Sequence, residues 1–326
     1  MDILTAASLP WLEGARTQLE QAWKGGRLPH SLLIVSPPGL GAQALAHWSA
    51  ALVLCDEARA PCGHCASCRL LLADSHPDLK RVALEEDAQQ LKVDQIRALI
   101  ESLSLSSYRS GFKVGIVESA EALNINGANA FLKTLEEPTQ STLLMLVATP
   151  AHRLPATIAS RCQRLTLRAP ELASARAWLA AQRPAVKRWD AALALAGGAP
   201  LAALELEAAG IEALDRDMRE SLKGLVSGAL DVTTLADRWA RSDPALRLTW
   251  LENWITTRVR THLGGDDSAQ TAEPVRLPAA LLKPKIRRLF ELLDAARELR
   301  RLASTGLNQQ LALEALLLEG RAALVR

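Results

Sequence analysis

The feature of this sequence that most constrains its fold is the alternation of strand and helix patterns before Pro170. Apolar runs with strand character lie at 31–36, 79–84, 112–117, 142–148 and 165–167. The helical patterns between them lie at 40–55, 93–103, 127–135 and 154–160. Strands that alternate with helices predict a parallel sheet covered by helices on both faces. Only helical patterns follow Pro170, which predicts an α/β domain at 1–168, a small helical domain at 169–210 and an all-α domain at 211–326.

The composition is that of a globular protein. With 326 residues, of which 49% are hydrophobic and 23% charged, the chain is long enough for two or three domains with substantial cores. Its net charge of +2 argues neither for nor against a nucleic-acid partner. No apolar run approaches the roughly 18 residues of a membrane-spanning helix, and residues 1–5 lack the basic start of a secretory signal. We therefore expect a cytoplasmic protein without a membrane partner.

The stretch from Ser31 to Ala46 resembles a phosphate-binding loop between a strand and a helix. The pattern G-x-x-x-x-G-K-[ST] would place its first glycine at Ser36, its second at Gly41, its lysine at Ala42 and its hydroxyl residue at Gln43. The lysine that contacts the phosphates and the hydroxyl that holds Mg²⁺ are therefore both missing. Gly39 and Gly41 still permit a tight turn. Taken alone, this stretch could also be an ordinary connection between a strand and a helix.

The strand at 112–117 is followed by an acidic residue where nucleotide hydrolases carry one. Glu118 falls at the position of the aspartate that holds Mg²⁺, and Ser119 falls at the position of the residue that activates water. A carboxylate that is one methylene longer, followed by a hydroxyl without basicity, makes a poor hydrolysis site. A strand end with a solvated acid is the alternative interpretation.

Four cysteines lie within fourteen residues, in an insert at about 55–78. They are Cys55, Cys62, Cys65 and Cys68. A structural zinc ion takes four soft ligands in a tetrahedron, and a spacing of two residues between cysteines lets both thiolates of one turn reach the same ion. This spacing predicts a structural zinc site with no open position for catalysis. A set of unliganded thiols is the alternative.

Three further stretches resemble one family. They are Gly26–Ser31, Asn129–Pro138 and Thr157–Cys162. Their order and spacing after a loop of the P-loop type are similar to those of the clamp-loader branch of the AAA+ proteins. The four-cysteine insert narrows the resemblance to the subunits of the bacterial DNA polymerase III clamp loader. The missing lysine favours a subunit that neither binds nor hydrolyses ATP over the ATP-hydrolysing gamma/tau subunit.

The resemblance implies an architecture and a set of partners. It implies an AAA+ core, a helical lid domain and a helical collar, through which the chain joins gamma/tau and delta subunits in a ring of five. It also implies that this ring loads a sliding clamp onto primer-template DNA, as part of a holoenzyme with DNA-directed DNA polymerase (nucleotidyltransferase) activity. In related loaders the arginine of the Ser-Arg-Cys triplet reaches the ATP of a neighbouring subunit, which would be the role of Arg161. The alternative for Arg161 is an ion pair with a local carboxylate.

Two other functions remain open at this point. The chain could be a gamma/tau-like AAA+ subunit that hydrolyses ATP with an unusual loop. It could also be a zinc-dependent DNA-binding protein that acts alone. Candidates for contacts with DNA phosphates are Arg97, Arg109 and Lys113.

Overall fold

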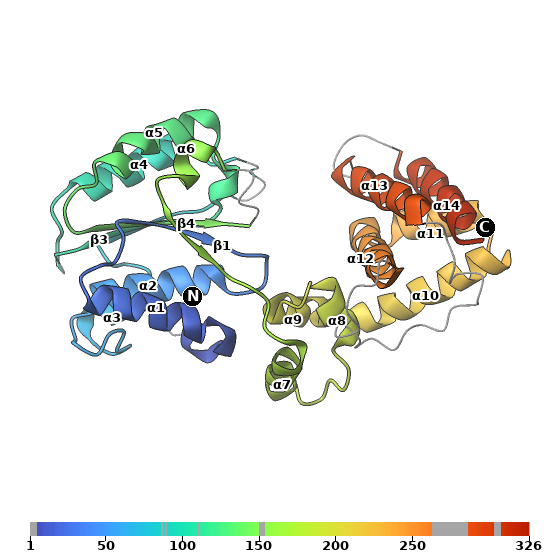
Figure 1. The fold of residues 1–326 in the computed structure, drawn as a ribbon, viewed down its shortest axis with the longest axis horizontal. Helices are drawn as coiled ribbons and strands as arrows, with labels where there is room; N and C mark the ends of the chain where they lie inside the picture. The colour runs from blue at the N-terminus through green and yellow to red at the C-terminus, as the bar shows by residue number, and fades with distance from the viewer. Residues whose placement is uncertain are drawn as a thin grey trace. The chain divides into compact units, whose positions relative to one another are not determined.

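The protein forms two compact units in a computed structural model, Met1–Glu171 and Leu172–Arg326. Figure 1 shows their folds along the chain, from blue to red. The structure describes residues 5–85, 88, 90–109, 111–149, 154–262, 286–302 and 308–325. Each unit is described below by itself.

The first unit is built on a five-stranded sheet with the order β2-β3-β4-β1-β5. The strands are β1 (Ser31–Val35), β2 (Leu79–Val82), β3 (Lys113–Val117), β4 (Thr142–Ala148) and β5 (Gln163–Thr166). All neighbouring pairs are parallel, with Ser31 opposite Leu144 and Leu32 opposite Gln163. Every residue of β1, β3 and β4 is buried, as expected for a sheet that is covered on both faces.

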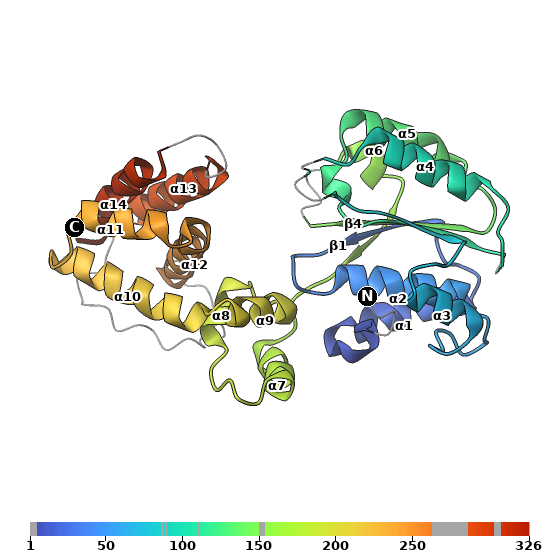
Figure 2. The same cartoon turned by 180° about the vertical axis from the view of Figure 1, so that it is seen from behind.

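Helices cover both faces of this sheet (Figures 1 and 2). On one face lie α1 (Glu13–Lys24), α2 (Ala42–Leu54) and α3 (Ala66–Leu72). On the other lie α4 (Val93–Ser104), α5 (Ile125–Glu136) and α6 (Ala156–Ala159). Short 3₁₀ turns lie at η1 (Thr5–Ser8), η2 (Pro10–Leu12) and η3 (Ala120–Ala122). The predicted parallel sheet with helices on both faces is confirmed.

A glycine sets how closely α4 packs on the sheet. A Cβ on Gly115 of β3 would lie 3.0 Å from Leu99 Cδ1 and 3.1 Å from Leu103 Cδ1, both on α4. Because such contacts are too short for carbon atoms in a packed core, a larger residue would push α4 away from β3. These leucines belong to a core cluster that also contains Phe131 and Leu135 of α5. The positions of α4 and α5 on the sheet are therefore fixed by close apolar packing.

The structure differs from the sequence prediction mainly inside the cysteine insert. The sequence patterns predict no helix between 55 and 93, yet Ala66–Leu72 forms α3. Its N-cap is Cys65, whose sulfur accepts the Cys68 backbone N–H. The last strand also begins two residues earlier than predicted, at Gln163. The helix predicted at 127–135 is α5, which ends at Glu136, because the residue before Pro138 avoids the helical region.

In the described part of the second unit, helices are the only regular elements. They are α7 (Leu172–Gln182), α8 (Asp190–Leu195), α9 (Pro200–Ala208), α10 (Ile211–Ser227), α11 (Val232–Arg241), α12 (Pro244–His262), α13 (Ile286–Leu302) and α14 (Gln309–Val325). One buried cluster contains residues of α7 to α9, and a second contains residues of α10 to α14. The division of this unit at 210 into lid and collar remains a prediction.

Candidate functional site

The loop after β1 keeps the shape of a phosphate-binding turn. Gly39 and Gly41 have φ values of 77° and 83°, in the left-handed region that favours glycine. Gly41 is the N-cap of α2. The next residue, Ala42, is 5% exposed and replaces the lysine, while Gln43 is exposed at the hydroxyl position. The turn therefore lacks the side chains that would hold a triphosphate and its Mg²⁺.

Two contacts from other segments fix this loop. The Trp11 Nε1–H donates to the Leu40 carbonyl at 2.9 Å, and the Ser36 N–H donates to the Ala148 carbonyl of β4 at 3.1 Å. Leu40 itself is fully buried. Hydrogen bonds from Trp11 and to β4 thus fix the backbone of the loop.

Glu118, at the predicted Mg²⁺ position, already has two partners within the chain. Its Oε1 lies 3.3 Å from His47 Nε2 of α2 and 3.2 Å from Arg81 Nη1 of β2. The hydrogen bond from His47 and the positive charge of Arg81 lower the pKa of this carboxyl group, against the effect of burial. Arg81 also pairs with Asp74, which follows α3. The carboxylate is therefore compensated by side chains where a hydrolase would use a metal ion.

Neither His47 nor Arg81 was identified from the sequence. His47 is 5% exposed in a helix whose other residues are almost all buried and mostly apolar. A polar residue in such a helix signals a buried partner, but the sequence does not say which. Ser119, the predicted position of the catalytic base, follows Glu118 and precedes η3, and its hydroxyl has no basicity to activate water.

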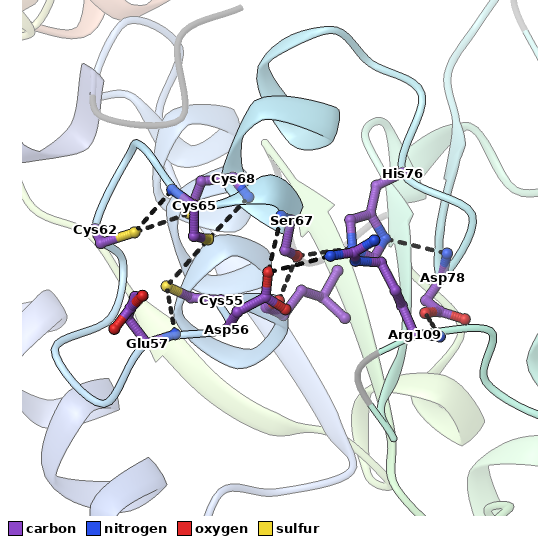
Figure 3. A network of polar contacts seen from close by, with 11 residues as sticks. Cys55, Asp56, Glu57, Cys62, Cys65, Ser67, Cys68, His76, Asp78 and Arg109 are labelled. Atoms are coloured by element: carbon purple, nitrogen blue, oxygen red, sulfur yellow. Dashed lines mark hydrogen bonds and ion pairs between the residues drawn. The ribbon is translucent and has the colours of Figure 1, made fainter.

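The four cysteines of the insert converge on one point (Figure 3). Their sulfur atoms lie within 4.8 Å of one another, with Cys55 Sγ 3.8 Å from Cys65 Sγ and Cys62 Sγ 3.9 Å from Cys68 Sγ. Zinc–sulfur bonds of about 2.3 Å in a tetrahedron place the sulfurs about 3.8 Å apart. The donor set and its dimensions therefore fit a tetrahedral zinc ion.

Backbone N–H groups favour the thiolate form of Cys62, whereas burial raises the pKa of the Cys55 and Cys68 thiols. The Cys65 N–H donates to Cys62 Sγ and the Cys68 N–H donates to Cys65 Sγ, each at 3.3 Å. Although burial opposes it, the N–H groups of His64 and Cys65 lower the pKa of the Cys62 thiol to about 6. The His64 ring lies 2.9 Å from the Cys62 carbonyl through Nδ1, so it is engaged with the backbone. The predicted set of four cysteines is brought together, with His64 outside it.

A buried chain of hydrogen bonds ties the insert to the sheet (Figure 3). The Asp78 N–H donates to His76 Nδ1 at 3.1 Å, so His76 Nε2 carries the proton that it donates to Ser67 Oγ at 2.8 Å. The Ser67 hydroxyl donates to the Leu54 carbonyl at the end of α2. Burial lowers the pKa of His76, partly offset by the Asp78 carboxylate. The neutral imidazole of His76 thus links α3 to the start of β2, and the Ser67 hydroxyl links α3 to the end of α2.

Arg161 lies at the surface, next to the end of α5. Its Nε and Nη2 donate to Glu136 Oε1 at 2.8 and 2.5 Å, and its Nη1 donates to the Thr157 carbonyl at 3.0 Å. The side chain of Arg161 is 35% exposed and that of Glu136 is 51% exposed. An ion pair with a local carboxylate is therefore present in the single chain. Pairs this exposed contribute about 0–1 kcal/mol, so the contact leaves Arg161 available to other groups.

The three sequence stretches that carried the resemblance meet at the amino end of β1. His30 Nε2 lies 3.1 Å from the Leu135 carbonyl, and the Ser31 hydroxyl donates to the Arg161 carbonyl at 2.8 Å. Arg161 in turn contacts Glu136. Residues about 100 and 130 positions apart thus form one site, which explains why all three stretches occur together.

The phosphate loop and Arg161 lie at opposite ends of β1. Leu32 pairs with Gln163 in the parallel strands β1 and β5, so Arg161 is level with His30, just before β1. The loop begins at Ser36, just after β1 ends. At about 3.3 Å per residue, the strand separates these two levels by about 20 Å.

The three basic candidates for DNA contacts differ in their surroundings. Lys113 is 8% exposed, with Nζ 3.5 Å from Thr139 Oγ1, because it begins a central strand. Arg109 pairs with Asp56 of the cysteine insert at 3.4 Å. Arg97 is 72% exposed and lines an open pocket between α4 and α5. Burial makes Lys113 unsuitable for a phosphate contact, which corrects the expectation from sequence.

Among the helices that the structure describes, none combines the length and apolar character needed to span a membrane.

Comparisons with known proteins agree over nearly the whole chain. Residues 12–171 match a family described as "DNA polymerase III, delta subunit", and residues 217–321 match "DNA polymerase III, delta subunit, C terminal". The DNA polymerase III subunit delta-prime of Pseudomonas aeruginosa is 34% identical, over 95% of this chain and 96% of its own. The subunit of the same name from Escherichia coli is 33% identical, over 95% and 94%.

Two further relatives match either a smaller part of the chain or the chain at lower sequence identity. The DNA polymerase III subunit tau of Escherichia coli is 31% identical over 51% of this chain and 26% of its own. A solved gamma subunit-related protein from Thermotoga maritima shares 19% identity with a TM-score of 0.44, over 94% of this chain and 99% of its own.

Fold and site together define an AAA+ α/β core with a lysine-free phosphate loop, followed by a helical C-terminal region. The chain belongs to the DNA polymerase III delta-prime subunit family, as the match to its members over about 95% of the chain shows.

Proposed function

We propose that this chain is the non-hydrolysing delta-prime subunit of a DNA polymerase III clamp loader, and that Arg161 completes the ATP site of a gamma/tau neighbour. The observation that carries the proposal is the separation of the two functional elements along β1. Arg161 lies at the amino end of the strand and the degenerate loop at the carboxyl end, about 20 Å apart. An arginine in that place lies too far from its own loop to contact a nucleotide there, so a role beside a triphosphate requires a nucleotide held by another chain.

The chemistry of the arginine suits this role. A guanidinium beside the γ-phosphate stabilises the charge that develops in the transition state, and arginines supplied by a second protein raise rates by roughly 10³–10⁵-fold. The chain's own loop supports the same division of labour, because Ala42 replaces the lysine and Glu118 is compensated by His47 and Arg81. In this proposal the subunit binds and hydrolyses no ATP.

The wider assembly follows from the family. The proposal places the chain in a five-membered ring with gamma/tau and delta subunits, which loads a sliding clamp onto primer-template DNA in the cytoplasm. The nucleotidyltransferase activity of the DNA polymerase III holoenzyme would belong to other subunits. A zinc ion held by Cys55, Cys62, Cys65 and Cys68 would fix the insert and do no chemistry.

The decisive experiment is reconstitution of the ring with Arg161→Ala. Turnover at the adjacent ATP site is expected to fall by about 10³-fold or more. The DNA-stimulated ATPase rate of the whole ring should therefore fall by the part that this site contributes. Arg164→Ala, which removes an exposed arginine of β5, is the matched control and should leave the rate unchanged. An unaltered ATPase with Arg161→Ala would refute the role in trans.

Binding and turnover experiments on the isolated chain distinguish the proposed function from the two alternatives. It should neither bind an ATP analogue nor turn over ATP, and robust hydrolysis would support a gamma/tau-like enzyme instead. A salt-dependent affinity for DNA that is lost on zinc chelation would support a DNA-binding protein that acts alone.

A further inference from the structure

The guanidinium of Arg161 is held in one orientation by two acceptors. Glu136 Oε1 accepts hydrogen bonds from Nε and Nη2, and the Thr157 carbonyl accepts one from Nη1. A guanidinium carries five N–H groups. After these three bonds, one N–H on Nη1 and one on Nη2 remain. Two N–H groups on neighbouring nitrogens are the arrangement that matches two oxygens of a phosphate group.

The backbone on both sides of this ion pair is fixed to the start of β1. The buried Ser31 hydroxyl donates to the carbonyl of Arg161 itself. His30 contacts the carbonyl of Leu135, which directly precedes Glu136 at the end of α5. Two adjacent residues therefore set the positions of both the arginine and its carboxylate. This support fixes the base of the guanidinium, while its tip remains partly exposed.

The ion pair is too exposed to be explained by stability. With side-chain exposures of 35% and 51%, the Arg161–Glu136 pair adds little to the free energy of unfolding. Its effect is on orientation, since a carboxylate that takes Nε and one Nη restricts the rotation of the guanidinium. An arginine that is already oriented loses less entropy when it meets a phosphate.

We propose that Glu136 is a positioning residue for Arg161, which it holds so that the remaining N–H groups face the triphosphate of a nucleotide bound by the neighbouring subunit. This inference rests on the proposed function, because it requires that Arg161 act in trans. Glu136 itself does not contact the nucleotide in this arrangement.

The test uses the reconstituted ring with Glu136→Gln, which keeps the size of the side chain and removes its charge. We expect the kcat of DNA-stimulated ATP hydrolysis at the adjacent site to fall about two- to fivefold with KM unchanged. Glu137→Gln is the matched control, because it removes the same charge at the next residue, which is exposed and is not a partner of Arg161. It should leave kcat unaltered. Equal incorporation into the ring and equal thermal unfolding of the variants confirm that folding is intact.

A double variant shows whether the effect passes through the arginine. In the Arg161→Ala background, Glu136→Gln should cause no further loss of rate, since there is no guanidinium left to position. A further loss in that background would overturn the inference. An unchanged or raised rate with Glu136→Gln alone would also overturn it, and a raised rate would mean that Glu136 restrains Arg161. If Arg161→Ala itself has no effect, the proposed function fails, which separates the two ideas.

Discussion

The charged side chains near the two ends of β1 differ in how far they are buried and in what compensates their charge. At the carboxyl end, the side chains of His47 and Glu118 are 6% and 20% exposed, and they bond to each other. At the amino end, Arg161 and Glu136 are 35% and 51% exposed. The first end has its charges compensated internally, whereas the second presents a cation at the surface.

In the proposed function, this difference separates an end that holds no nucleotide of its own from an end whose arginine serves a neighbouring subunit. A half-buried acid that no Mg²⁺ ion compensates needs other partners, because an uncompensated buried charge is costly. His47 and Arg81 supply them. The amino end has no such requirement, since solvent already screens its charges. Substitutions at the carboxyl end and in the neighbouring insert should therefore change stability, and those at the amino end should change activity in the ring.

Removal of the metal is expected to have the largest effect on stability. Chelation of the zinc should lower the free energy of unfolding by several kcal/mol, on the order of 5, because metal binding to thiolates is coupled to folding of the insert. Chemical unfolding with and without chelator, together with the zinc content of the purified chain, measures this. Cys68→Ser should reproduce the loss, and Cys162→Ser, outside the cluster, should not. Unaltered stability of the zinc-free chain would contradict a stabilising role of metal binding in the insert.

Loss of Arg81 tests whether the carboxyl end is compensated internally. Arg81→Met should destabilise the chain by about 1–2 kcal/mol, because Glu118 keeps only His47 as a partner. Adding Glu118→Gln should recover most of this loss, since the neutral amide needs no counter-charge. Arg97→Met, at an exposed arginine of α4, is the control and should change stability little. Equal effects of the Arg81 and Arg97 substitutions would erase the contrast between the two ends of the strand.

The smallest expected effect is a pH dependence that comes from His76. Its pKa in the folded chain is lowered by burial, so the unfolded chain binds the proton more readily. Its contribution to stability is therefore fully present above the unfolded pKa of about 6.5 and is lost as pH falls from that value through the lowered pKa of the folded chain. Asp78 and Asp56 favour its protonation and Arg109 opposes it, which keeps the effect modest.

Unfolding curves between pH 7.5 and 5 measure this loss, and the difference between the unaltered chain and His76→Gln isolates it from the Cys62 thiol, whose pKa of about 6 lies in the same range. His76→Gln should flatten the pH dependence over this range. An equally steep dependence in the variant would assign the titration to another group.

The sequence predicted those parts of the molecule that depend on local patterns. The alternation of strands and helices led to the parallel sheet, and the spacing of the cysteines led to their convergence on one point. It did not reveal α3, because the helix begins at a cysteine that serves as its cap. Nor did it reveal the pairs His47–Glu118 and Glu136–Arg161. Their partners are 71 and 25 residues apart, and only the packed sheet brings them together.

The bond from Ser31 to the Arg161 carbonyl spans 130 residues of sequence. A contact of such high sequence separation closes a long loop, and this costs entropy that other contacts must recover. In this unit, β1 can pair with β5 only after the segment between them has been synthesised, with β2, β3 and β4 in it. In a nascent or partly folded chain, Arg161 therefore lacks this placement. In the proposed role of Arg161, only a fully folded subunit could therefore complete the ATP site of its neighbour.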